Sequence, residues 1–299
     1  MSVYNIHGLK VKLKLGKFVI TVELEPPKGA DPMPVLEKAR LLAGYIDGVN
    51  IADSPMAKLR MSPIALAHII QQDMGIEAVF HLTCRDRNIL GLQSELLGAS
   101  ALGVKNILTL TGDDPAKGDH PNAGGVFEID STGLASIAKR LNQGFDLSGN
   151  ELNSPTNFFI GGAVNPGADN IDFEVEKLKR KIEAGVEFVQ TQPVFHITQV
   201  DRFLEKTHHL PVHIIFGILP LKGLKMANYL RENVPGIEIS EDIITKIKIG
   251  QRQAGIEVSQ QLIEQMKNIV QGIHLYPIGD LQTVYDVLEI KEASRQRII

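Results

Sequence analysis

A carboxylate interrupts what is otherwise the pattern of a buried β-strand near the N-terminus. Residues 18–24 read FVITVEL, a run of strand-forming residues, and Glu23 lies inside it. A carboxyl group among apolar neighbours can have its pKa raised until it donates a proton near neutral pH. Glu23 is therefore the first candidate for a general acid, whereas Glu25, beyond the strand end, is expected to be solvated or ion-paired.

Polar side chains recur at alternate positions in four apolar runs. Because side chains along a strand alternate between its two faces, residues of one parity share a face. On this basis the polar face carries Thr21, Glu23, His81, Thr83, Thr109, Thr111, Asp113, Gln190 and Gln192. The opposite face, which we expect to pack against helices, carries Phe18, Ile20, Val22, Leu24, Phe80, Leu82, Leu108, Leu110 and Val189. A single polar side chain in a strand is usually a satisfied core group, but agreement among four strands indicates a shared site.

The elements that must position these side chains alternate between strand and helix. Eight apolar runs occur at residues 18–24, 48–52, 78–83, 106–111, 158–164, 187–192, 212–219 and 272–278. Segments of helical period separate them, and the region before the eighth run is long enough for an extra helix. This pattern predicts one (β/α)8 TIM barrel over residues 1–299. A doubly wound open sheet is the alternative, although the turn EPPKGAD after the first run lacks its glycine-rich fingerprint.

In a barrel, the carboxyl ends of the strands form the usual active-site face. The polar face would converge there on Glu23, His81, Thr83, Thr111, Asp113 and Gln192. A long loop at 112–125 follows the fourth run on the same side, and Gly112 would let a flat ligand approach the backbone. The residues alone therefore indicate a barrel enzyme with one or two catalytic carboxylates and a polar ligand.

Composition excludes several other classes of function. The net charge is −4, which argues against a general nucleic-acid-binding surface. The only cysteine, Cys84, allows no disulfide within the chain and no thiolate metal cage, and we expect it to be a small buried hydrophobe. No run has the length of a membrane span or the form of a signal peptide, so a cytoplasmic protein is expected. Residues 1–16 are predicted to form a short strand capping the bottom of the fold.

An ordered set of motifs carries a family resemblance. These motifs are E-x-x-P-P at 23–27, HLTCRDRN at 81–88, LQSELLGASALGVKNILTLTGDDP at 92–115, LKRKIEAG at 178–185, TQPVF at 191–195 and GILP at 217–220. Over nearly its whole length the chain resembles the methylenetetrahydrofolate reductases, which are flavin-containing barrel enzymes. The resemblance implies the reduction of 5,10-methylenetetrahydrofolate to 5-methyltetrahydrofolate, in one-carbon metabolism and methionine biosynthesis.

The resemblance also implies roles for individual residues. Glu23 corresponds to the general acid, Asp113 to an aspartate beside flavin and folate, and Gln192 to a pterin-binding glutamine. Phe195 and Tyr276 are expected to join Gln192 in binding the substrate. The expected cofactor contacts are His81, Thr83, Thr111, Asp113, Ala163, Asn165 and Lys181. FAD is the expected flavin, with FMN as the alternative.

Several positions depart from the family pattern. Thr111 stands in place of an arginine, Asn165 in place of a tyrosine and Asp280 in place of an arginine. The family's phenylalanine that stacks on the nicotinamide is replaced near Leu224. These changes fall on nucleotide, donor and folate-tail contacts. They leave the electron donor open between NAD(P)H and a small partner subunit carrying zinc and iron–sulfur centres. An oligomer is expected, as is common in this family.

Two other functions remain open at this stage. One is a flavin-free barrel methyltransferase that passes a methyl group from a folate to a corrinoid. The other is a non-catalytic barrel subunit that acts as a docking scaffold in a larger redox complex. A scaffold has no need of a polar core face, which argues against the second alternative.

Overall fold

Eight parallel strands close into a barrel in chain order in the computed structural model, which describes residues 8–291. The strands are β1 Val19–Leu24, β2 Gly48–Ile51, β3 Ala78–Thr83, β4 Asn106–Leu110, β5 Phe159–Val164, β6 Phe188–Pro193, β7 His213–Ile218 and β8 Gly272–Leu275. Parallel pairing of β1 with β8 closes the barrel, with Val19 opposite Gly272. The predicted (β/α)8 barrel is confirmed.

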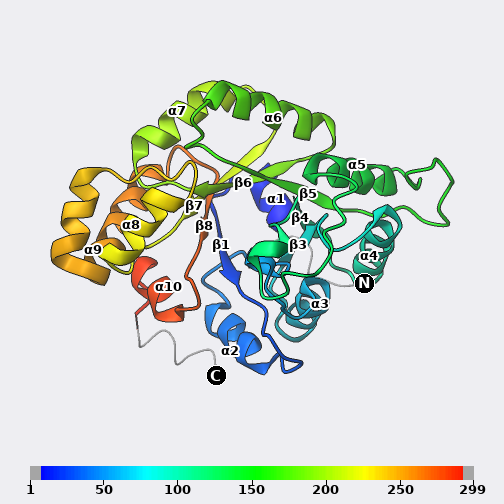
Figure 1. Ribbon diagram of the computed structural model, residues 1–299, viewed down its shortest axis with the longest axis horizontal. Coiled ribbons are helices and arrows are strands. Elements are labelled where there is room, and N and C mark those ends of the chain that lie inside the picture. Colours follow the sequence, from blue (N-terminus) through cyan, green and yellow to red (C-terminus); the bar gives the residue numbers. More distant parts are fainter. Residues whose placement is uncertain (1–7, 292–299) are drawn as a thin grey trace.

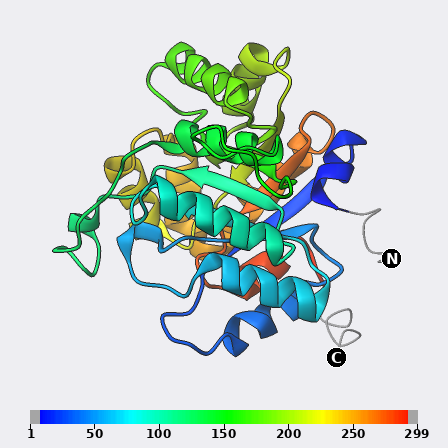
Figure 2. The same cartoon turned by 90° about the vertical axis from the view of Figure 1, so that its right-hand side faces the viewer.

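Helices surround the strands on the outside (Figures 1 and 2). They are α2 Met33–Leu42, α3 Pro63–Met74, α4 Ile89–Ala101, α5 Ser131–Asn142, α6 Ile171–Glu183, α7 Ile197–Thr207, α8 Leu224–Asn233, α9 Glu241–Met266 and α10 Leu281–Val287, with 3-10 turns η1 Pro55–Ala57 and η2 Pro115–Lys117. Both α8 and α9 lie between β7 and β8, which confirms the extra helix. In the described part of the chain, no helix combines the length and apolar character needed to cross a membrane.

The apolar face of most strands packs against the helices as predicted. Val22, Leu24, Phe80, Leu82 and Val189 are buried in one core between the strands and the surrounding helices. Cys84 is buried in the same core as a free thiol, in agreement with its predicted role as a small hydrophobe. The outer face of the barrel wall is therefore apolar, and the polar residues of β1, β3 and β6 are directed to the inside.

The parity predicted for β4 is wrong. Leu108 lies in the cluster that fills the barrel interior, Leu110 packs against that cluster, and Ile107 belongs to the outer core. Thr109 instead donates its hydroxyl to the carbonyl of Gly161 in β5, at 2.8 Å. A threonine whose hydroxyl donates to a neighbouring strand has its hydrogen bond without facing the polar interior. The polarity of Thr109 therefore led to the wrong prediction of which face it lies on.

The predicted N-terminal strand is also wrong, although the predicted cap is present. Residues 9–14 form the helix α1 Leu9–Lys14, while residues 1–7 of the predicted strand lie outside the described residues. Leu9 and Leu13 are four residues apart, share one helix face, and are buried in the barrel interior. Lys12 forms an ion pair with Asp47, just before β2. The alternation of Leu and Val with Lys suits a strand, but this i, i+4 pair suits a helix that closes the amino end of the barrel.

Candidate active site at the carboxyl end of the barrel

A cavity of about 350 Å³ opens at the carboxyl ends of the strands. Its lining combines strand residues with loop residues: Glu23, Ala52, Asp53, Pro55, His81, Thr83, Leu108, Leu110, Thr111, Gly112, Asp113, Ala163, Gln190, Thr191, Gln192 and Tyr276. All the site residues predicted from the sequence line this cavity except Phe195, Asn165 and Lys181. The convergence expected from strand alternation is therefore present.

A larger depression of about 710 Å³ lies at the opposite, amino end of the barrel. It is bounded by residues 71–77 and by Gly103, Lys105 and Asn106, at the ends of α3 and α4. This depression receives no side chains from the polar inner faces of β1 or β6. The cavity at the carboxyl end is therefore the better candidate for an active site, although its volume is smaller than that of the depression.

Glu23 is one of three carboxyl groups that line the cavity, with Asp53 and Asp113. Its side chain is partly exposed and lines the cavity, so it does not turn outward into the helical shell. Burial raises its pKa from 4.5 to about 7, and the negative charge of Glu25 adds to the shift. Glu25 itself binds Arg60, whose Nε donates to Glu25 Oε1 at 2.8 Å, so its predicted ion-paired role is confirmed. Glu23 can therefore hold a proton near neutral pH.

A network of amides and imidazoles crosses the barrel interior beside Glu23. Nδ2 of Asn50 lies 3.0 Å from Nε2 of His81 and donates to Oε1 of Gln190 at 2.6 Å. Thr21 Oγ1 lies 3.5 Å from Gln190 Nε2 and 2.9 Å from Nδ1 of His274. Burial lowers the pKa of His81 to about 4 and that of His274 to about 3, so both imidazoles are neutral at pH 7. Asn50 and His274 were not predicted, although each is a polar residue inside an apolar run.

Tyr276 completes the wall between this network and Glu23. Its hydroxyl donates to the backbone carbonyl of Thr191 at 3.2 Å, and its ring packs edge-on to His274 with centroids 4.5 Å apart. Burial, together with the charge of Glu23, raises the pKa of the Tyr276 hydroxyl. Tyr276 therefore contributes a neutral, fixed aromatic surface to the cavity.

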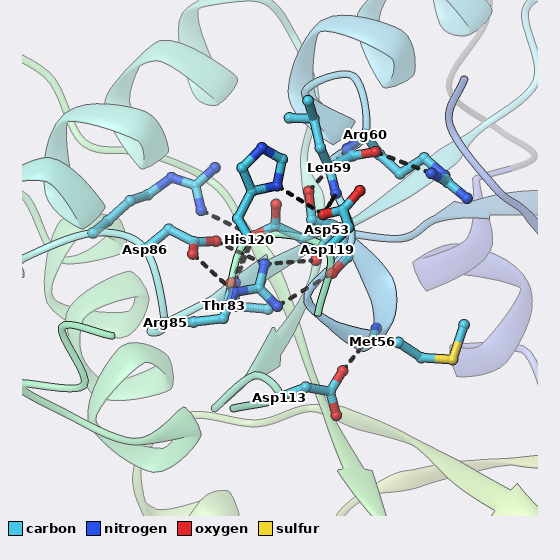
Figure 3. A network of polar contacts seen from close by, with 12 residues as sticks. Asp53, Met56, Leu59, Arg60, Thr83, Arg85, Asp86, Asp113, Asp119 and His120 are labelled. Atoms are coloured by element: carbon cyan, nitrogen blue, oxygen red, sulfur yellow. Dashed lines mark hydrogen bonds and ion pairs between the residues drawn. The ribbon is translucent and has the colours of Figure 1, made fainter. Parts of the chain in front are cut away.

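Charged residues tie together the ends of β2 and β3. Oδ2 of Asp53 accepts hydrogen bonds from the backbone N–H and hydroxyl of Thr83 and from Nη1 of Arg87, each at 2.9 Å. Arg85 forms an ion pair with Asp86 and donates to the carbonyl of Ser54 (Figure 3). Asp53 was not predicted as a site residue; its only signal was its position directly after a strand run. These contacts hold Thr83 in place at the cavity wall.

The loop after β4 supplies the opposite side of the mouth. Asp113 is exposed and accepts a hydrogen bond from the backbone N–H of Met56 at 2.9 Å (Figure 3). Thr111 accepts one from the backbone N–H of Ser131, at the first residue of α5. Because β4 ends at Leu110, Thr111 and Asp113 reach the cavity from the loop and not from the strand face.

Gln192 and Ala163 lie on the wall formed by β5 and β6. The side chain of Gln192 is exposed within the cavity lining. Lys181, on α6, lies behind Ala163 and donates its Nζ to the Ala163 carbonyl at 2.5 Å. Burial lowers the pKa of Lys181, and the nearby Glu174 opposes that effect. Lys181 therefore meets the cavity through Ala163 and does not line it.

Two predicted residues lie away from the cavity. Asn165 accepts from the backbone N–H of Gly167 and donates to the carbonyl of Pro235, so its side chain is directed toward the segment after α8. Phe195 is buried in a second apolar cluster with Leu219. The structure does not bring these two side chains to the cavity wall.

The lining has the chemistry to bind a polar ring. Gly112 presents only backbone atoms to the cavity, and its φ of +98° is one that glycine adopts readily. Hydroxyl, amide and imidazole groups supply hydrogen bonds from several sides, while Leu108 and Leu110 offer apolar surface. A volume of about 350 Å³ is in the range of small-molecule sites. The residues present therefore fit the ring of a flavin.

Fold and site together define a (β/α)8 barrel with a polar cavity that holds a high-pKa carboxyl group at its carboxyl end. The family model described as methylenetetrahydrofolate reductase matches residues 9–292. The chain belongs to the methylenetetrahydrofolate reductase family.

Several curated relatives carry the same description. Methylenetetrahydrofolate reductase 1 of Schizosaccharomyces pombe is 25% identical over 239 residues, which cover 75% of this chain but only 37% of that protein. The 5,10-methylenetetrahydrofolate reductase of Pectobacterium carotovorum is 26% identical over 214 residues, covering 70% of this chain and 66% of the relative. That of Buchnera aphidicola is 24% identical over 289 residues, covering 91% of each chain.

Solved structures support the fold. A protein of Clostridium thermocellum that binds two copies of 5-methyl-5,6,7,8-tetrahydrofolic acid superposes with a TM-score of 0.65 at 17% identity, covering 95% of this chain and 99% of that one. A 2,3-dimethylmalate lyase superposes with a TM-score of 0.54 at 9% identity, covering 97% of this chain and 85% of that one. At these identities the likeness concerns the barrel and not its chemistry.

Proposed function

We propose that this protein reduces 5,10-methylenetetrahydrofolate to 5-methyltetrahydrofolate, with a bound flavin as cofactor and Glu23 as the general acid. The observation that carries the proposal is the carboxyl group of Glu23, which lines the cavity and has a pKa of about 7. Family membership and the relatives' descriptions support the substrate. The folate bound by the Clostridium thermocellum protein is the proposed product.

Glu23 supplies the proton that opens the five-membered ring of the substrate. Near neutral pH a large fraction of its carboxyl groups is protonated, as a general acid requires. Donation to a folate nitrogen leaves a cationic iminium and a Glu23 carboxylate beside it. The exposed carboxylate of Asp113 at the mouth stabilises that positive charge, and the amide of Gln192 binds the pterin.

The cavity lining holds the cofactor. His81, Thr83, Thr111 and Ala163, which line the cavity, are the proposed contacts of the flavin ring. Lys181 would support them from behind, through its hydrogen bond to the Ala163 carbonyl. Flavin, when bound, supplies the hydride that reduces the exocyclic carbon. FAD is the proposed form, although Asn165 is turned away from the cavity and contributes no side-chain contact to its wall.

The electron donor is NAD(P)H or a small partner protein with zinc and iron–sulfur centres. The chain has one cysteine, so any such relay belongs to a partner. Members of this family commonly form oligomers, and we propose the same for this cytoplasmic enzyme.

Anaerobic reconstitution tests the function directly. The protein is loaded with FAD or FMN, its spectrum is recorded, and NADH, NADPH and reduced ferredoxin are compared for bleaching of the flavin. Addition of methylenetetrahydrofolate to the reduced protein should restore the oxidised spectrum and yield 5-methyltetrahydrofolate. A protein that binds methyltetrahydrofolate but no flavin would support the methyltransferase instead. A reduced protein that the substrate leaves unchanged would support the scaffold.

A further inference from the structure

The polar network across the barrel is a directional chain of hydrogen bonds between two neutral histidines. It runs from His81 through Asn50, Gln190 and Thr21 to His274, and each of these side chains is at least nine-tenths buried. The two amides form a reciprocal pair, because Asn50 donates to Gln190 at 2.6 Å and Gln190 donates back to Asn50 Oδ1 at 3.2 Å. No charged group lies within the chain itself.

The donors and acceptors at the two ends restrict the direction of these bonds. The side-chain nitrogen of Asn50 has hydrogens but no free lone pair, so Nε2 of His81 must accept from it. At the other end, Thr21 accepts from Gln190 and has one hydrogen left to give. Nδ1 of His274 lies at 2.9 Å and the Ile273 carbonyl at 3.5 Å, so the shorter contact favours His274 as the acceptor. The proton of His274 is then on Nε2, a buried nitrogen to which the described residues offer no hydrogen-bond partner.

We propose that Asn50 and Gln190 are positioning residues that hold His81 with its proton on Nδ1 and, through Thr21, hold His274 in the opposite tautomer. In a neutral imidazole one nitrogen donates and the other accepts, so an accepting Nε2 puts the proton on Nδ1. Within the described residues, no group hydrogen-bonds His81 Nδ1, and His81 lines the cavity. The free donor is therefore available to a ligand.

If His81 Nδ1 carries the proton, one chemical feature of the bound ligand follows. This step rests on the proposed function, in which a ligand binds beside His81. The ligand atom next to His81 is a hydrogen-bond acceptor, such as a carbonyl oxygen or an unprotonated ring nitrogen. A ligand that offers an N–H group there would face the His81 N–H group and leave both donors unpaired, which is costly in a buried site.

Nitrogen NMR of the cofactor-free protein tests the tautomers without reference to activity. Protein labelled with ¹⁵N-histidine is examined at neutral pH by long-range proton–nitrogen correlation, and His81→Phe and His274→Phe assign the two rings. We expect the proton on Nδ1 in His81 and on Nε2 in His274. The reverse pattern, or the same tautomer in both rings, would overturn the proposal. Failure of methylenetetrahydrofolate reduction would leave this result unaffected, so the two claims fail separately.

Two variants test the chain itself. Asn50→Asp places acceptor oxygens against Nε2, so Nε2 of His81 should carry a proton, either in the opposite tautomer or in an imidazolium paired with the new carboxylate. Thr21→Val removes the only hydrogen bond that residues 8–291 make to Nδ1 of His274, so that ring should lose its single tautomer. Thr109→Val is the matched control, because the hydroxyl of this buried threonine donates to the Gly161 carbonyl, away from the network. This variant should leave both rings unchanged. Unchanged tautomers in both Asn50→Asp and Thr21→Val would show that the network does not set them.

Discussion

At the residue scale, the chemistry proposed for Glu23 has a cost in stability. Below pH 4.5 the carboxyl is protonated in both the folded and the unfolded chain, so its ionisation does not change the free energy of unfolding there. Above pH 4.5 the unfolded chain loses this proton first, whereas the folded protein keeps it until about pH 7. The free energy of unfolding therefore falls over this window, by roughly 3 kcal/mol at 1.36 kcal/mol per pKa unit.

Substitution of Glu23 should reverse that loss. Glu23→Gln has no carboxyl to ionise, so it should be more stable than the wild type at pH 8, by up to roughly 3 kcal/mol. The advantage should shrink toward pH 4.5. Urea unfolding at several pH values measures this difference. Glu37→Gln is the control, because Glu37 is exposed on α2 and its charge does not contribute to the raised pKa of Glu23. An advantage of Glu23→Gln that is independent of pH would contradict the assigned pKa.

At the scale of elements, strand alternation predicted where most site residues lie. It placed Glu23, His81 and Gln192 on one inner face, and the barrel brings them to one cavity. It failed where a polar side chain finds a partner in the wall itself, as Thr109 does on the Gly161 carbonyl. Hydrogen bonds between distant segments, such as Asp53 with Thr83, have no sequence period and could not be predicted.

Residues after the strand ends were harder to predict than residues within the strands. Thr111 and Asp113 reach the cavity, while Asn165 turns toward the segment after α8, although all three follow strand runs. Loop backbones are not periodic, so parity carries no information beyond the last paired residue. Resemblance named these positions as contacts, but it could not give the direction of their side chains.

A substitution at Gly112 tests how closely the loop after β4 packs against the end of β3. A Cβ on Gly112 would lie 2.9 Å from Cβ of Arg85 and 3.0 Å from Cβ of Thr83, and the φ of +98° disfavours other residues. Gly112→Ala should therefore cost about 1–3 kcal/mol and lower the melting temperature. Gly124→Ala, in the same loop with no neighbour within 4 Å, should change it little. Equal shifts of the melting temperature in the two variants would mean that the ends of β3 and β4 can move apart to accommodate the added methyl group.

At the scale of the whole molecule, the two ends of the barrel differ. The amino end is filled by apolar side chains, including stacked Phe159 and Phe188 with ring centroids 4.6 Å apart, and is covered by α1. The carboxyl end carries the polar network and the cavity. The apolar half stabilises the barrel, so the polar half can hold buried imidazoles and a protonated carboxyl group.

The helix α1 should contribute measurably to global stability. Leu13 is 1% exposed and packs in the barrel interior, so Leu13→Ala should lower the free energy of unfolding by about 2–5 kcal/mol. Val11 lies on the same helix but is 36% exposed, so Val11→Ala should cost much less. Urea unfolding compares them. Similar losses would indicate that α1 does not act as a cap of the barrel.

The central claim is that Glu23 donates the proton in folate reduction, and separated half-reactions test it most directly. Flavin-loaded wild type, Glu23→Gln and the control Glu37→Gln are reduced anaerobically with the effective donor. Each reduced protein is then mixed with methylenetetrahydrofolate in a stopped-flow spectrometer. We predict that Glu23→Gln slows reoxidation by the folate about 10²–10⁴-fold. Its reduction by the donor should change only a few-fold, and Glu37→Gln should match the wild type. Equal loss in both half-reactions of Glu23→Gln, or no loss in either, would contradict the account.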